Sequence, residues 1–430
     1  MNGKYKLGLT RSRVFALENC VYFSGELGED AELSRLEKAI FMLREKYPLL
    51  GCVIELCENG EAYAVESLKE ISFACVNGDV CEIIREQRRL GFDFAKQLFR
   101  LLLINGRILA IFGHTAVCDV NSLALLAGEL MRFYRRESFD IERREPELFS
   151  SKSDLPDNAS SGVAERVANT LNFSWIKHDR FFSHSDYIKA AQEYSVKRPR
   201  QNTVAVSLSA DETASVITRC READADVSAA AAYCFYSRLM QSGALRGWDR
   251  HVLWQCSLRL FLSEDETRGI GPYNSAAAVK VPRAKKKGLS PFDAFQDETY
   301  KKHATCFSAF YDSVYLMEIL PQLCDAANLY EAGTFKNRTA KSLAKKEFNM
   351  RSCALGCGFL NLDQRYWENV RCLENVAFSE PFSGRAQYYL NILLHNNELK
   401  FELSCREGEL EDGKAAQVLE DAVKMLKELL

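Results

Sequence analysis

Hydrophobic residues recur along this chain with two periods, one typical of helices and one typical of strands. Residues 29–47 place leucine and isoleucine every three to four positions and run up to Pro48, which predicts an amphipathic helix. The apolar run of residues 48–56 predicts a buried strand after it. Residues 411–430 again have the helical period, so we expect an amphipathic helix at the end of this sequence.

The pattern is interrupted once and then begins again. Residues 137–162 are rich in charge, serine and proline, which favours a linker. A strand, a helix beginning near Asp211 and a second helix capped by Ser228 are predicted beyond it. Two β-rich runs joined by Asn396-Asn397 predict a hairpin. Because 430 residues exceed one ordinary core, we expect an α/β protein with two lobes, residues 1–162 and 163–430.

Composition narrows the class of protein. The formal net charge is −3 with scattered charges, so nothing predicts a nucleic-acid partner. The sequence starts without a secretory signal, and no window approaches about 18 consecutive apolar residues, so we expect a cytoplasmic protein without a membrane span. Its 15 cysteines lie mainly within apolar runs, typical of buried free thiols in a reducing compartment. Cys353 and Cys357 have no second ligand pair, so we expect no metal site.

One loop carries candidate chemistry. In AIFGHTAVCDVNSLALLAGELMRFYRR, residues 110–136, a predicted strand leads to His114 and Asp119, and a predicted helix follows. Cys118 lies between them, but no neighbouring cation in the sequence would activate its thiol. The loop is therefore either a catalytic site or the remainder of one.

The chain resembles the superfamily of condensation domains and coenzyme A-dependent acyltransferases, which share the chloramphenicol-acetyltransferase-like fold. The active-site loop of that superfamily reads His-His-x-x-x-Asp-Gly after a strand. Five further segments resemble it in the same order: residues 43–55, 91–106, 254–262, 269–281 and 351–361. The resemblance implies two lobes, each a mixed sheet packed with helices, with a tunnel between them.

This sequence departs from the motif at its central position. A serine often follows the motif Asp by three residues at the helix start, so Ser122 identifies Asp119 as that Asp. His114 then takes the first His position, Thr115 replaces the catalytic second His, and Val120 replaces the Gly. A threonine hydroxyl does not titrate near neutral pH, and loss of a general base typically costs about 10²–10⁴ in rate.

Three roles for His114 remain open from the sequence. It could support the loop as the first motif His does, act as the base with Thr115 as a hydroxyl relay, or be an ordinary core histidine. Adjacent residues on extended backbone point to opposite sides, so His114 and Thr115 are not expected to face the tunnel together.

The resemblance also implies positions around the loop. It pairs Asp119 with Arg259, although Asp119 could instead only cap the following helix. Tyr273 and Asn274 match the segment that lines the tunnel. His178 or His184 could supply a base from elsewhere in the chain, but exposed side chains are the stronger hypothesis for both. The basic run of residues 283–288 could bind phosphate, but a solvated loop is the stronger hypothesis for it.

Two functions follow from these observations. The first is transfer of an acyl group from a coenzyme A or carrier-protein thioester to a small-molecule amine or alcohol, with His114 and Thr115 as the catalytic residues. The second is an inactive condensation-like scaffold that binds a carrier domain or recruits a tailoring enzyme, since some domains of this fold with a replaced motif His recruit oxygenases. Coenzyme A or phosphopantetheine would be a co-substrate, and no bound cofactor is expected.

Overall fold

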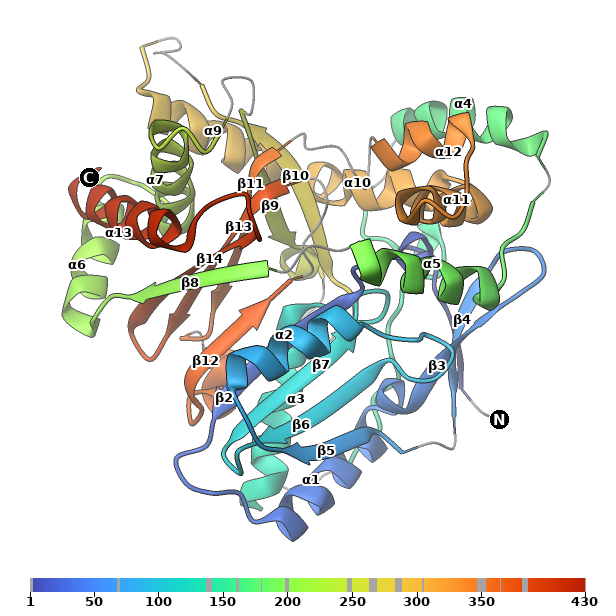
Figure 1. The fold of residues 1–430 in the computed structure, drawn as a ribbon, viewed down its shortest axis with the longest axis horizontal. Coiled ribbons are helices and arrows are strands. Elements are labelled where there is room, and N and C mark those ends of the chain that lie inside the picture. The colour runs from blue at the N-terminus through green and yellow to red at the C-terminus, as the bar shows by residue number, and fades with distance from the viewer. Residues whose placement is uncertain are drawn as a thin grey trace.

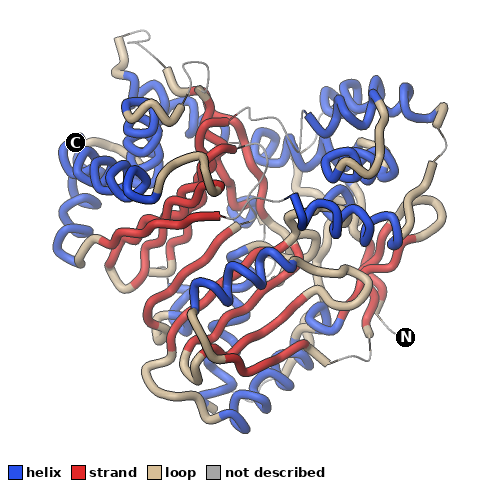
Figure 2. Tube along the Cα trace, viewed as in Figure 1, coloured by secondary structure: helices blue, strands red, loops and turns tan. Residues whose placement is uncertain are grey.

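The computed structural model describes residues 3–67, 70–136, 141–159, 162–178, 180–197, 201–245, 250–262, 269–282, 288–303, 305–345, 353–363, 365–380 and 386–429. Its strands form two large sheets and one small one (Figure 1). Helices cover these sheets, and further helices gather at the end of the molecule opposite the C-terminus (Figure 2). The basic run at residues 283–287 lies outside the described residues.

The first large sheet holds the motif strand near its centre. Its five strands run in the order β12 (Glu374–Ser379), β2 (Cys20–Glu26), β7 (Ile108–His114), β6 (Phe99–Ile104) and β5 (Ser72–Val76). Helix α2 (Val80–Leu90) covers one face, and α1 (Leu33–Lys46) and α3 (Val120–Arg135) cover the other. A small sheet of β1 (Lys4–Lys6), β4 (Ala62–Glu66) and β3 (Cys52–Leu56) lies beside it. The predicted first helix is confirmed as α1. The strand predicted over residues 48–56 starts only at Cys52, because Pro48–Gly51 form a short 3-10 helix.

The second large sheet has six strands. Their order is β10 (Asn274–Lys280), β9 (His251–Ser257), β11 (Cys353–Asn361), β13 (Ala386–His395), β14 (Glu398–Arg406) and β8 (Gln201–Ser207). The helices packed with it are α6 (Ala210–Glu222), α7 (Val227–Gln241), α9 (Pro291–His303) and α13 (Asp412–Leu429). The predicted hairpin is confirmed, because β13 and β14 pair antiparallel around Asn396 and Asn397, which both have positive φ.

Two features of the second half were not predicted. Strand β12 pairs antiparallel with β2, so a strand from residues 163–430 completes the sheet that carries the motif loop. Helix α7 begins earlier than expected, because Asp226 and not Ser228 accepts the capping bond, from the Ala229 amide at 2.8 Å.

A further group of helices packs on β10 of the second sheet through α10 and contacts the first half at the short turn Arg11–Arg13. It contains α4 (Gly162–Ile176), α5 (His184–Lys197), α10 (Cys306–Glu318), α11 (Pro321–Ala332) and α12 (Arg338–Leu343). Arg11 of the first half holds α11 through a buried two-fold ion pair with Asp325, at 2.8 and 2.6 Å. Within the described ranges, no helix is both long and apolar enough to cross a bilayer.

Candidate functional site at the motif loop and the adjacent cavity

His114 is sealed inside the first lobe. It ends β7 with no exposed surface, and its ring packs edge-on to Phe92 at a centroid distance of 6.2 Å. Its Nδ1 accepts the Ala116 amide at 3.0 Å, which leaves the proton on Nε2, and Nε2 has no partner among the described residues. Burial lowers the pKa of His114 to about 3. The imidazole is therefore neutral at physiological pH, and it has no exposed surface.

Thr115 is also enclosed. Its amide donates to the Asn19 carbonyl at 2.9 Å, and its carbonyl accepts from Arg13 at 3.4 Å. Its hydroxyl is buried without a described partner. These contacts fix the loop backbone, and the residues that the sequence assigned to catalysis both lie in the protein interior.

Asp119 both caps a helix and forms an ion pair. Its Oδ1 accepts the Ser122 amide at 2.7 Å, which starts α3, and contacts the Arg259 guanidinium at 3.1 Å. Ser122 adds a contact to the Gly271 carbonyl at 2.7 Å. The residues that the resemblance pairs are thus in contact, and their network ties the loop to the second lobe.

Tyr273 and Asn274 lie in the same buried lobe contact. Tyr273 stacks under Arg259 at 4.7 Å and donates its hydroxyl to the Glu147 carbonyl at 2.7 Å. The Asn274 amide oxygen accepts from Arg13 at 2.7 Å. Neither residue lines the two cavities described below, because these hydrogen bonds hold both side chains between the lobes.

Glu380 and Arg13 belong to this site and were missed from the sequence. The Glu380 carboxyl accepts hydrogen bonds from the side-chain amide of Asn274 at 3.2 Å and from the backbone amide of Val120 at 3.4 Å. Burial and then the charge of Asp119 raise the pKa of Glu380 to about 7. The only sequence signal was a charged residue after an apolar strand, and it gave no partner.

We expect Glu380→Gln to stabilise the protein at alkaline pH. A carboxyl whose pKa rises from 4.5 to about 7 contributes stability below pH 4.5 that is lost as the pH rises through 7. At pH 8 this loss is about 3 kcal/mol, and the neutral amide of the variant avoids it. The amide gives up one hydrogen bond, which costs the variant about 1 kcal/mol. Urea unfolding should show a net gain of about 2 kcal/mol at pH 8 and none at pH 5. An equal effect at both pH values would contradict the buried titration.

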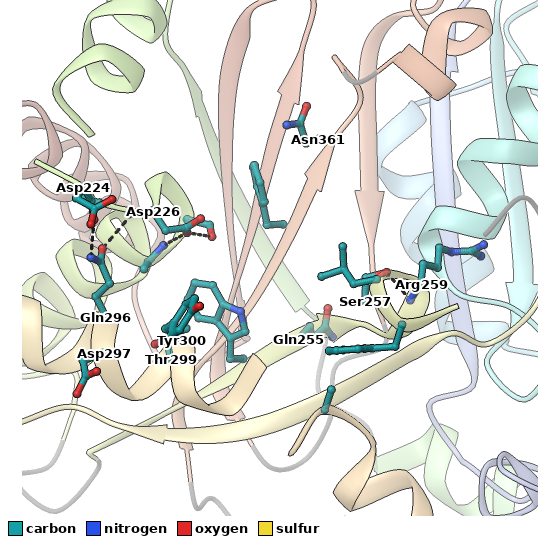
Figure 3. Close-up of a pocket in the computed structure, with 18 of the residues that line it drawn as sticks. Asp224, Asp226, Gln255, Ser257, Arg259, Gln296, Asp297, Thr299, Tyr300 and Asn361 are labelled. Atoms are coloured by element: carbon teal, nitrogen blue, oxygen red, sulfur yellow. Dashed lines mark hydrogen bonds between the residues drawn. The ribbon is translucent and has the colours of Figure 1, made fainter. Parts of the chain in front are cut away.

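A cavity of about 1330 Å³ opens beside the loop (Figure 3). Asn121 at the start of α3 lines one part of it. The lining continues from Arg259 to Asp226, which caps α7, and to Asp297 of α9. Its aromatic and polar lining comes mainly from the second lobe: Asn121, Trp254, Gln255, Ser257, Arg259, Phe261, Tyr300, Phe359, Asn361 and Trp367, with Asp224, Asp226, Asp293 and Asp297 towards the helices. His114 and Thr115 are not among the lining residues.

A second, smaller cavity lies between the lobes on the α2 side. Its volume is about 370 Å³, and α2, β2, β12, β8 and β14 contribute to its walls. Tyr22 and Arg88 line it, and Arg88 contacts the Glu380 carbonyl at 3.4 Å. Glu380 therefore lies between this cavity and the motif loop.

The remaining sequence candidates do not join the site. His184 pairs with Asp93 at 2.6 Å, and His178 contacts Asn337 at 3.1 Å. Neither lines the larger cavity, and the His303 side chain is outside the described residues. The Cys118 thiol is buried against the His114 carbonyl at 3.5 Å, and burial raises its pKa, so it is not an activated nucleophile.

Comparison with known proteins identifies the fold. No family model and no curated protein matches the sequence. Among solved structures, the condensation domain of the monacolin K polyketide synthase superposes with a TM-score of 0.62 at 11% identity, covering 99% of this chain and 97% of that one.

Two further solved structures extend the comparison. The epimerization domain from the third module of tyrocidine synthetase B superposes with a TM-score of 0.63 at 13% sequence identity, covering 100% of this chain and 97% of that one. The trichothecene 15-O-acetyltransferase of Fusarium sporotrichioides superposes with a TM-score of 0.59 at 12% sequence identity, covering 99% of this chain and 95% of that one. The chain therefore has the predicted two-lobed fold of condensation domains and chloramphenicol-acetyltransferase-like acyltransferases.

Proposed function

We propose that this chain is a condensation-type scaffold that binds a thioester-linked acyl group in its larger cavity and does not use an imidazole to transfer that group. The observation that carries the proposal is the state of His114, which is neutral, buried and bonded through Nδ1 to its own loop. A general base must lie within hydrogen-bond reach of the proton it removes. Thr115 supplies only a buried hydroxyl at the position where the base is expected.

The cavity supports a binding role. Its volume of about 1330 Å³ exceeds that of most small-molecule sites, so an acyl chain and a pantetheine arm would both fit. Trp254, Phe359 and Trp367 offer apolar faces, while Gln255 and Asn361 offer hydrogen-bonding groups. A carrier protein or coenzyme A would present the thioester. With the thioester bound, this chain would act as a partner of a synthetase or tailoring enzyme.

Asn121→Trp tests the binding site. Asn121 lines the cavity where it approaches the motif loop, so an indole there should block that end. We expect acetyl-pantetheine to bind about tenfold more weakly to this variant in calorimetry, a loss of about 1.4 kcal/mol. Thr203→Trp is the matched control, because Thr203 lines the smaller cavity and its substitution should leave binding unchanged. Equal affinity in all three proteins would overturn this site.

The absence of transfer is tested separately. Acetyl-coenzyme A and a panel of amines should give no product above the buffer rate, and Thr115→His should add none. Turnover that disappears in His114→Ala while the fold is retained would overturn the proposal.

Glu380 supports acyl transfer as a second candidate function. Its carboxyl is buried and lines neither cavity, so a substrate would have to enter between the smaller cavity and the loop to reach it. The carboxyl touches the loop amide of Val120, and a pKa of about 7 suits a general base. Turnover that rises with pH through 7 and is lost in Glu380→Gln, but not in His114→Asn, would establish this candidate in place of the scaffold.

A further inference from the structure

One end of the molecule combines exposed apolar and basic side chains. We name as the α4–α12 surface the residues Phe173, Ile176, Lys177, Arg180, Lys336, Arg338, Lys341 and Lys345. They belong to α4, α12 and the residues next to these helices, which lie at the outer edge of the helical group in Figure 1. None of them lines either cavity, so the inference is independent of the function proposed above.

The two segments are in direct contact. The amide of Asn337, which caps α12, contacts the His178 imidazole at 3.1 Å, just beyond the end of α4. The Arg180 guanidinium lies 4.9 Å from the centre of the Phe335 ring, immediately before α12. The basic residues of both segments therefore belong to one continuous area.

The apolar side chains of this surface are unusually exposed. Phe173 is 71% exposed and Ile176 is 64% exposed, although both are large. Phe173 and Ile176 are three residues apart and so lie on one side of α4. Lys177 follows the helix directly, and its ammonium lies 6.0 Å from the Phe173 ring. The helix thus presents insertable apolar groups next to a cation.

The charge of this surface has one sign. Residues 173–181 and 335–345 contain the six cations Lys177, Arg180, Lys336, Arg338, Lys341 and Lys345, against the single acid Asp179. These two segments therefore have more cations than acids, whereas the whole chain has a net charge of −3. Lys336, Arg338, Lys341 and Lys345, on α12 or next to it, are exposed. Within the part of the chain that the structure describes, none of them forms an ion pair with a carboxylate.

We propose that the α4–α12 surface binds an anionic lipid membrane. Lipid headgroups attract clustered Lys and Arg, and bulky apolar side chains enter the boundary between headgroups and acyl chains. A membrane binds a protein through charge and inserted apolar side chains and needs no pocket. This fits the α4–α12 surface, which neither cavity reaches. The protein would bind peripherally, with its cavities in the aqueous phase.

Vesicle sedimentation tests this proposal on the full chain. We expect the protein to sediment with phosphatidylcholine vesicles that contain phosphatidylserine and to stay in solution with phosphatidylcholine alone. Each Lys or Arg near an anionic surface is worth about fivefold in affinity, so Lys336→Glu, Arg338→Glu and Lys341→Glu together should weaken binding by at least about a hundredfold. Phe173→Ser with Ile176→Ser should also weaken it.

The matched control reverses three exposed cations elsewhere. Lys38, Lys302 and Lys424 lie on α1, α9 and α13, so their change to Glu gives the same net charge. That variant should bind almost like the original protein. Equal losses in both triple variants would overturn the proposal, because general charge would then explain binding. Failure of the original protein to bind the anionic vesicles would overturn the lipid assignment. If the original protein then captured polyglutamate and the triple variant Lys336→Glu, Arg338→Glu, Lys341→Glu did not, the surface would be assigned to an acidic protein.

Discussion

Asp119→Ala is expected to lower the free energy of unfolding by about 3–5 kcal/mol, measured by urea denaturation at neutral pH. The Asp119 side chain is fully buried, and the Arg259 side chain that it contacts is 8% exposed. Removing the carboxylate leaves the guanidinium buried without this partner charge, and it also removes the cap that starts α3. The variant should therefore lose stability in both the motif loop and the lobe contact.

Asp79→Ala separates the two contributions. Asp79 caps α2 through the Glu82 amide at 2.7 Å, the same distance as the cap formed by Asp119, but Asp79 is exposed. Loss of a cap alone costs about 1 kcal/mol. If Asp119→Ala destabilises the protein no more than Asp79→Ala does, the buried ion pair contributes nothing and the lobe contact depends on other groups.

The fold was predictable because its signals are local or ordered along the chain. The helical period gave α1, the two-asparagine turn gave the β13–β14 hairpin, and the sequence around His114 and Asp119 identified the strand–loop–helix unit. The contact between Asp119 and Arg259 was also accessible, because the resemblance supplied the partner across 140 residues.

The rest of the site depends on the chain's path, which no local pattern records. Glu380 reaches the Val120 amide only because β12 crosses to pair with β2. Arg13 reaches Asn274 from a short turn near the start of the chain, 261 residues away. The cavity is likewise assembled from the ends of strands and helices that carry no shared motif.

These long-range contacts hold the loop in place, although Thr115 occupies the position at which the resemblance implies a histidine. Asp119, Ser122, Arg259 and Gly271 bind one another across the lobes, and Arg13, Asn274 and Glu380 form a second buried link. Each link leaves charged groups in the interior, where loss of one partner is costly. Stability of the lobe contact is therefore sufficient reason for the loop to persist, whether or not acyl transfer takes place there.

Acid is expected to destabilise the original protein more than its His114→Asn variant. The pKa of His114 is about 3 in the folded protein because of burial, against 6.5 when unfolded. The unfolded state therefore binds more protons between these values, and the stability that neutral His114 contributes is lost as the pH falls below 6.5. At pH 4 this loss is about 3 kcal/mol, whereas the Asn oxygen can accept the Ala116 amide without titrating.

The measurement is the difference in unfolding free energy between the two proteins from pH 8 to pH 4. This difference should change by about 3 kcal/mol in favour of His114→Asn between pH 8 and pH 4. At pH 8 the variant should be the less stable protein, because it loses the ring contact with Phe92. His251→Asn is the control, because half-burial lowers the pKa of His251 without enclosing it, and the corresponding difference should change less. A pH-independent difference for His114→Asn would mean that the imidazole is accessible to protons in the folded state, and a proton acceptor at the motif loop would again be available for acyl transfer.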